Sequence, residues 1–272
     1  MNLSDIIRDV AIPTTIGIFS LMTPILLEAL SRIDNKYNSV ILVTAFKREL
    51  LYKQYVFTLL ASIVSIVIWC LNLPRIVNIP WLNNFIDNSA AYLLLTTTLS
   101  LVIISLGVIR LLTIYYVPRS LLKRFTEKYN KSKDKEFYFG CVSKLFNYSL
   151  IVPDDDMTRY SWDFVSKEIE KHRDNPSEYP SFIYKAVYEA DDLLCRRENN
   201  TIISFQNTSY FPLLMQCRNE ISDKLYSFLW NSLRQFLFYD KTTYIYDYWK
   251  AAHHYYLSHF SRYYLVFSFF SH

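Results

Sequence analysis

Hydrophobic positions run without interruption over three stretches in the first half of the chain. Residues 10–27, 54–74 and 88–109 contain no Asp, Glu, Lys or Arg, and they are 18, 21 and 22 residues long. A helix rises about 1.5 Å per residue, so each stretch reaches about one hydrocarbon thickness of a bilayer. The pattern predicts three transmembrane helices, over about residues 10–29, 54–73 and 90–112.

The first predicted span is the least regular of the three, because Pro13 and Pro24 interrupt it and Glu28 lies at its end. Proline is tolerated in a spanning helix when neighbouring groups satisfy the freed carbonyls. Two interpretations stay open: a full, kinked crossing, or a re-entrant segment beside two true spans. A cleaved signal peptide is not expected, since Asp5 and Asp9 make the N-terminal region acidic.

A shorter pattern of helical period lies between the first two spans, over about residues 39–53. Val43, Phe46, Leu50 and Lys53 recur every three or four residues, and Lys47 lies beside them. This predicts one amphipathic helix at the membrane interface that runs into the second span. Packing beneath a soluble domain is the alternative.

The rest of the chain changes character at about residue 118. Residues 1–117 hold 8 basic and 6 acidic residues, whereas residues 118–272 hold 21 and 19. Apolar residues in the second part recur with helical period between Pro and Asn clusters, and residues 201–206 are the one strand-like piece, which we expect to be a linker. The fold class is therefore all-α: an integral membrane protein with a membrane module (1–117) and a helical, aromatic-rich cytoplasmic domain (118–272).

Positive charge predicts the orientation. Lys and Arg cluster between the first two spans and after the third, while only Arg8 and Arg75 lie on the other side. By the positive-inside rule, the N-terminus is outside and the C-terminal domain is cytoplasmic. Only three residues are Gly and aromatics reach 17%; this Tyr-, Phe-, Asn- and Lys-rich composition suggests a bacterial protein of the inner membrane.

Composition and motifs exclude several function classes. A net charge of +4 is too small for a nucleic-acid-binding surface, so no nucleic acid is expected as a partner. No nucleophile elbow, Walker loop or zinc-protease motif occurs. The acidic clusters 154–156 and 189–192 fit helix starts and solvated faces. We therefore expect no enzyme activity, no metal and no cofactor; an enzyme built on Asp247, His253 or His254 is the remote alternative.

Four polar residues near the third span are candidates for a pore lining or for helix contacts: Thr96, Thr97, Ser100 and Arg110. Ser and Thr more often make contacts between helices, and Arg110 can reach the interface beyond Ile109. Three helices cannot surround a water-filled pore. A conducting role therefore needs several copies, and the sequence predicts a homo-oligomer.

Tyrosines gather towards the C-terminus, where their large bodies and polar hydroxyls suit helix packing or subunit contacts. The candidates for an oligomer or partner interface are Tyr244, Tyr248, Tyr255, Tyr256 and Tyr263.

The leading functional hypothesis is an oligomeric pore-type effector in the lipid bilayer that is gated or assembled through its helical domain. A non-conducting scaffold that anchors a cytoplasmic protein partner is the alternative.

Overall fold

The computed structural model describes residues 3–71, 88–152, 154–172, 179–196 and 222–269. Of these residues 91% are helical and none lies in a strand, which confirms the all-helical expectation. The chain forms two compact units, Met1–Leu121 and Leu122–His272. The predicted linker 201–206 and the basic residue Arg75 lie outside the described residues.

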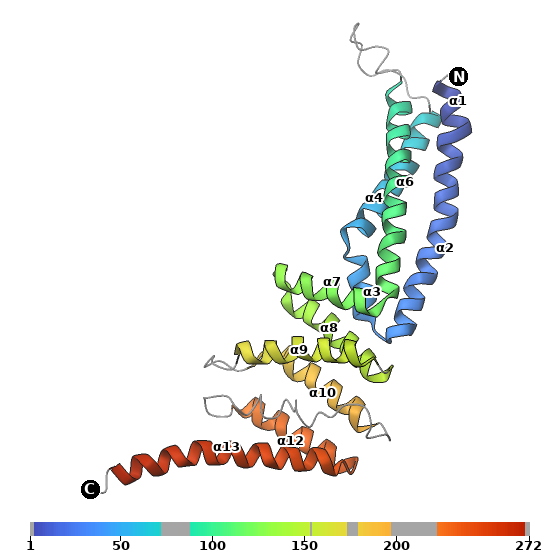
Figure 1. The fold of residues 1–272 in the computed structure, drawn as a ribbon. Helices are drawn as coiled ribbons and strands as arrows, with labels where there is room; N and C mark the ends of the chain where they lie inside the picture. Colours follow the sequence, from blue (N-terminus) through green and yellow to red (C-terminus); the bar gives the residue numbers. More distant parts are fainter. Residues whose placement is uncertain (1–2, 72–87, 153, 173–178, 197–221, 270–272) are drawn as a thin grey trace. The chain divides into compact units, whose positions relative to one another are not determined.

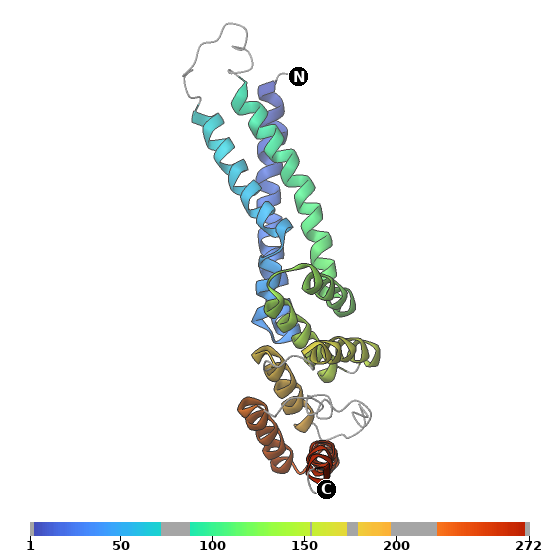
Figure 2. The ribbon, with the colours of Figure 1, turned by 90° about the vertical axis from the view of Figure 1, so that its left-hand side faces the viewer.

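The first unit is a bundle of three long helices (Figures 1 and 2). The first runs over Leu3–Tyr37 as α1 (Leu3–Ile6), the π-helical turn η1 (Ile7–Ala11) and α2 (Ile12–Tyr37), followed by α4 (Leu50–Leu71) and α6 (Ser89–Tyr116). All three are long and apolar enough to cross a membrane. Each pair of them is in contact. The first helix is longer at both ends than the predicted span 10–29.

The π turn explains how the first helix continues past proline. Pro13 has no amide hydrogen and its ring would clash with the carbonyl four residues earlier. The backbone widens just before it, and the amide of Ile12 donates to the carbonyl of Ile7, five residues back. Pro24 lies inside α2 without breaking it. The helix is therefore continuous over 35 residues.

The helix predicted over 39–53 is wrong in one respect, because the structure breaks it in two. Helix α3 (Val40–Lys47) ends at Arg48, and α4 begins at Leu50. Phe46 is fully buried, whereas Leu50, expected on the same face, is 68% exposed. The break turns the carboxyl of Glu49 inward, where the residue is only 4% exposed.

The second unit is a succession of helices, and the division between the units falls within the first of them, α7 (Pro118–Lys131). The others are α8 (Lys135–Ile151), α9 (Asp155–His172), α10 (Ser181–Cys195), α12 (Asp223–Phe238) and α13 (Thr242–Phe269). Helix α8 contacts both α9 and α10, α10 contacts α12, and α12 contacts α13.

Local polar residues fix several of these helix starts. Side-chain oxygens of Asp134, Asp154 and Ser222 accept hydrogen bonds from backbone amides three residues further on, at 3.4, 3.1 and 3.2 Å. Such caps satisfy amides that have no partner within the helix. The acidic start predicted at 154–156 is thus confirmed as a cap.

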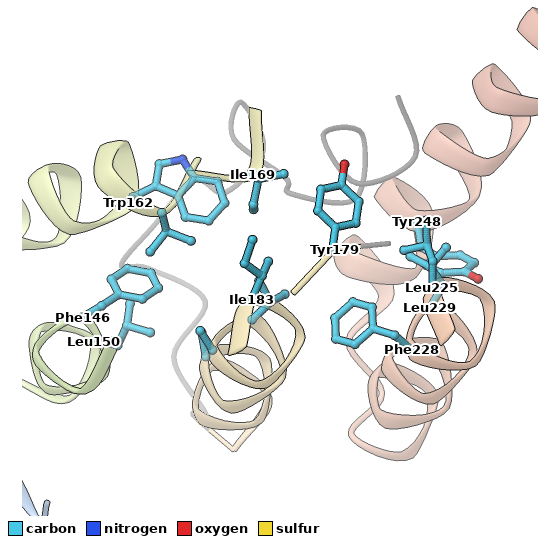
Figure 3. Packing of buried hydrophobic residues seen from close by; sticks show 14 of the residues in the cluster. Phe146, Leu150, Trp162, Ile169, Tyr179, Ile183, Leu225, Phe228, Leu229 and Tyr248 are labelled. Carbon is cyan, nitrogen blue, oxygen red and sulfur yellow. The ribbon is translucent and has the colours of Figure 1, made fainter. Parts of the chain in front are cut away.

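An apolar core lies between helices of the second unit (Figure 3). Phe146 of α8 packs beside Trp162 of α9, with ring centroids 6.3 Å apart. Ile183 of α10 lies in the middle of the cluster, and Phe228 and Leu229 of α12 close it on the side of Tyr248. Large aromatic side chains here fill the space between helices.

Candidate functional site

One hydrogen bond between side chains links the first and third long helices deep in the bundle. The hydroxyls of Thr15 and Thr98 lie 3.1 Å apart, and the two residues are 1% and 7% exposed. Thr15 also donates to the carbonyl of Ala11 at 3.0 Å. A bond of this kind holds two helices in register in an apolar medium.

Elsewhere the interior of the bundle is filled. Leu94, Leu101 and Val108 of α6 are fully buried. The buried hydroxyls of Ser62 and Ser105 donate to backbone carbonyls of their own helices, at 2.9 and 2.7 Å, so they allow close packing without lining a channel. Within the described residues, one copy offers no continuous polar path.

The four residues predicted from the sequence do not share one environment. Thr96 is exposed and donates to the Tyr92 carbonyl at 2.9 Å, and Thr97 is half-buried and donates to that of Leu94 at 3.1 Å. Ser100 and Arg110 are exposed. Thr96, Ser100 and Arg110 lie within an arc of about 80° on the outside of α6, counted at about 100° per residue. We call these three residues the outer polar face of α6.

A polar cluster joins all three long helices at the end of the bundle where α3 lies. The Tyr115 hydroxyl donates to the Glu49 carboxyl at 3.1 Å, and the Tyr37 hydroxyl donates to the Tyr115 carbonyl at 3.0 Å. Lys36 donates to the Tyr116 carbonyl at 2.7 Å. The last carbonyls of a helix lack partners within it, so α2 caps α6 here. We call Lys36, Tyr37, Glu49 and Tyr115 the collar.

Aromatic packing surrounds the collar. The Phe46 ring of α3 lies edge-on to that of Tyr115, with centroids 5.0 Å apart, and to that of Tyr52 at 5.4 Å. Phe46 and Tyr115 are both fully buried. The collar therefore also fixes α3 against the bundle. Sequence reasoning missed it, because the residues are far apart in the chain.

The predicted tyrosines of α13 divide between core and surface. Tyr248 is 8% exposed, and burial raises the pKa of its hydroxyl; Tyr244 stacks on Phe236 with centroids 5.4 Å apart. Tyr256 is 53% exposed. The side chains of Tyr255 and Tyr263 lie outside the described part.

The surface of the last two helices carries further aromatic and aliphatic residues that are about half exposed or more. They are Tyr226, Trp230, Leu237 and Phe238 of α12 with Tyr246, Trp249, Tyr256 and Leu257 of α13. Exposed aromatic residues of this kind are enriched where proteins meet. We call these residues the α12–α13 aromatic surface.

Polar contacts tie α10 to its neighbours. Glu189 accepts from Lys144 at 2.7 Å and from Asn147 at 3.2 Å, both on α8. Asp192 accepts from Gln235 of α12 at 2.8 Å. Acidic residues expected on a solvated face thus hold helices together.

Asp191 of α10 departs further from the expected solvated face, since it is only 1% exposed where α10 meets α12. The fully buried Ser232 of α12 lies close enough to its carboxyl to interact with it. Burial raises the pKa of Asp191 well above its usual range, against a smaller opposing effect of Ser232. The carboxyl is therefore protonated at pH values where an exposed aspartate is ionised.

The other titratable groups give little support for catalytic activity or metal binding. Burial raises the pKa of the Cys195 thiol to about 12, with the charge of Asp191 adding to the effect, so the thiol is unreactive. His253 and His254 are exposed on α13, and the side chain of Asp247 is outside the described part. Among the residues that the structure describes, no three His, Cys, Asp or Glu side chains lie close enough to hold a metal ion.

Comparison with family models, curated proteins and solved structures finds no match to this chain. What the residues themselves show is a helical protein with three helices able to span a membrane. Function therefore has to be argued from the bundle, the collar and the exposed surfaces.

Proposed function

We propose that the chain is a multi-pass membrane protein that works as a homo-oligomer and alters membrane permeability, as a pore-type effector. The observation that carries the proposal is the outer polar face of α6. This face exposes polar side chains on a helix whose other exposed residues include large apolar ones such as Leu99 and Ile103. Polar groups in a bilayer are costly unless they meet protein or water.

The packed interior of the bundle is the second argument for several copies. Because Leu94, Leu101 and Val108 fill the space between the three helices, ions have no route through one protomer. A ring of copies that turns α6 inward would place Thr96 and Ser100 around a shared axis. Their hydroxyls would then line a narrow path, and Arg110 would stand at its mouth.

Charge supports an orientation for this assembly. Lys47, Arg48 and Lys53 flank the α3 end of the bundle, and α7 adds further basic residues beyond α6. We place this end and the second unit in the cytoplasm and the N-terminus outside, in the inner membrane of a bacterial cell. The proposal assigns no catalytic role and no cofactor.

A second candidate function is a non-conducting scaffold that holds a cytoplasmic protein at the membrane. The α12–α13 aromatic surface supports it, since exposed Trp and Tyr residues are enriched where proteins meet. The Tyr residues predicted for this role contribute Tyr256 to that surface. A scaffold carries no ion flux, which separates it from a pore.

The two candidates are distinguished by purifying the whole protein, measuring its particle mass in nanodiscs, and recording ion flux after reconstitution into vesicles. The pore proposal expects at least four copies and a flux that Ser100→Leu abolishes or reduces by more than tenfold.

Thr113→Val is the matched control, because Thr113 is an exposed threonine of α6 that bonds its own helix at the Ile109 carbonyl but lies about 100° away from Thr96. It should leave flux unchanged. A monomer or dimer, or vesicles that stay sealed at high protein content, would contradict the pore and favour the scaffold.

A further inference from the structure

The collar stands next to a stiff joint in the chain. Helix α6 ends at Tyr116 and α7 begins at Pro118, so Val117 alone connects them. Val117 is extended, with φ −100° and ψ 104°, and the amide of Leu121 donates to its carbonyl at 3.0 Å. A residue before proline is restricted to extended conformations, and proline fixes its own φ. Val117 and Pro118, which both lie within the first unit, therefore have few accessible backbone conformations.

That last turn is where the collar is attached. Tyr115 takes part twice, as the acceptor for Tyr37 through its carbonyl and as the donor to Glu49 through its hydroxyl. The neighbouring carbonyl of Tyr116 accepts from Lys36. If the end of α6 rotated, or moved along its axis by one helical turn, these groups would move together. The contacts to α2 and to the start of α4 are therefore made or lost as a set.

We propose that the collar and the Val117–Pro118 joint form a conformational coupling device. In the engaged state, the collar holds the ends of α2 and α6 and the start of α4 together, and it keeps α3 packed against Tyr115 through Phe46. When the second unit moves α7, the joint rotates the end of α6, the collar opens, and α3 is released. Closely packed contacts of this kind switch between discrete arrangements rather than deform smoothly. The device concerns communication along the chain and does not depend on the proposed pore.

The first test asks whether the collar holds α3. Amide hydrogen exchange of Val40–Lys47 is measured in the whole protein in nanodiscs. Tyr115→Phe removes the donor to Glu49, and Glu49→Ala removes the acceptor. Each should speed exchange of these amides about tenfold, as expected for the loss of one buried hydrogen bond. Because both remove this bond, the double variant should exchange more slowly than the product of the two single effects predicts.

Tyr52→Phe is the matched control. Tyr52 also packs on Phe46, but its hydroxyl takes no part in the collar. Its removal should change exchange less than twofold. If the control accelerates exchange as much as Tyr115→Phe, or if neither collar variant accelerates it, the collar does not hold α3 and the proposal is overturned.

The second test asks whether the joint transmits. Exchange of α3 and of α8–α10 is followed as temperature rises, in the native chain and in a chain with two glycines inserted between Val117 and Pro118. In the native chain, α3 should lose protection in the same interval in which the second unit melts. In the chain with the loosened joint, α3 should stay protected through that interval. If α3 loses protection at the same temperature in both chains, or stays protected in both, the coupling is overturned, whatever the flux measurements show.

Discussion

The buried carboxyl of Asp191 should make the second unit less stable as pH rises above the usual pKa of an aspartate. Because burial raises its pKa, the folded protein keeps a proton that the unfolded chain has already released. Folding then becomes less favourable as pH rises from about 4, the usual pKa of aspartate, up to the pKa of the folded state. One unmatched proton corresponds to a loss of about 1.4 kcal/mol per pH unit across that window.

Asp191→Asn removes the ionisable group and keeps the shape of the side chain, so the variant should lack this slope. The assay is unfolding of the whole protein in mild detergent between pH 5 and pH 8, followed by loss of the second unit's helical signal. In this window the variant should gain stability over the wild type as pH rises. Measurements below pH 5 are avoided because Glu168 also makes stability depend on pH there. Burial raises the pKa of Glu168, but the nearby Tyr129 hydroxyl and the Lys171 ammonium, 2.9 Å away, lower this pKa overall.

Asp240→Asn is the control, since Asp240 is an exposed acid of the same unit whose positive φ of 51° suits asparagine equally well. It should keep the wild-type slope. If Asp191→Asn and the wild type lose stability in parallel over the window, the argument that burial keeps this carboxyl protonated is refuted.

Three further tests probe individual contacts by unfolding in mild detergent, followed in each case for the unit that holds the contact. Thr98→Val should destabilise the first unit by about 0.6 kcal/mol. The effects of Thr98→Val and Thr15→Val should add up to less than their sum in the double variant, since one bond joins the two residues; full additivity would argue against the bond. Ser222→Ala should cost about 1 kcal/mol through loss of the α12 cap, and restoration by aspartate at that position would identify capping as the cause. Glu189→Gln should cost about 1 kcal/mol by weakening the contact with Lys144, and Lys144→Met in its place should be comparably harmful; a neutral result for both would show that this ion pair contributes nothing.

Helix positions in the bundle were predictable because they follow from local physics. Charge-free stretches of 18 to 22 residues leave few alternatives to a spanning helix. The extension of the first helix to Tyr37 was missed, because polar residues such as Glu28 and Arg32 lie on its exposed side. The buried side still repeats every three or four residues, through Met22, Leu26, Ala29, Ile33 and Tyr37.

Thr98 could have been found from the sequence. It belongs to a buried stripe whose members are alternately four and three residues apart, a spacing typical of the contact face between packed helices. The stripe consists of Leu94, Thr98, Leu101, Ser105 and Val108. A polar residue in such a seam has to meet a partner, and Thr15 is that partner. Thr96 and Thr97 were selected by composition alone, which says nothing about the side of the helix on which a residue lies.

The collar and Asp191 were beyond sequence reasoning for a different reason. No Gly or Pro marks the turn at Arg48 and Glu49, so nothing local predicts that the helix breaks there. Glu49 and Tyr115 are 66 residues apart, and their contact exists only because α4 and α6 pack together. The burial of Asp191 was hidden for a similar reason: the nearby acids Glu189 and Asp192 are partly exposed, whereas Asp191 lies close to Ser232 of α12.

The central claim is that copies of the chain meet through the outer polar face of α6. Oxidative cross-linking of Ser100→Cys in native membranes tests it most directly, in a chain whose exposed Cys70 is replaced by serine. Leu27→Cys, on an apolar exposed position of α2, is the control. The account predicts covalent dimers through position 100 and none through position 27. Monomers alone at position 100, or equal cross-linking at both positions, would contradict it.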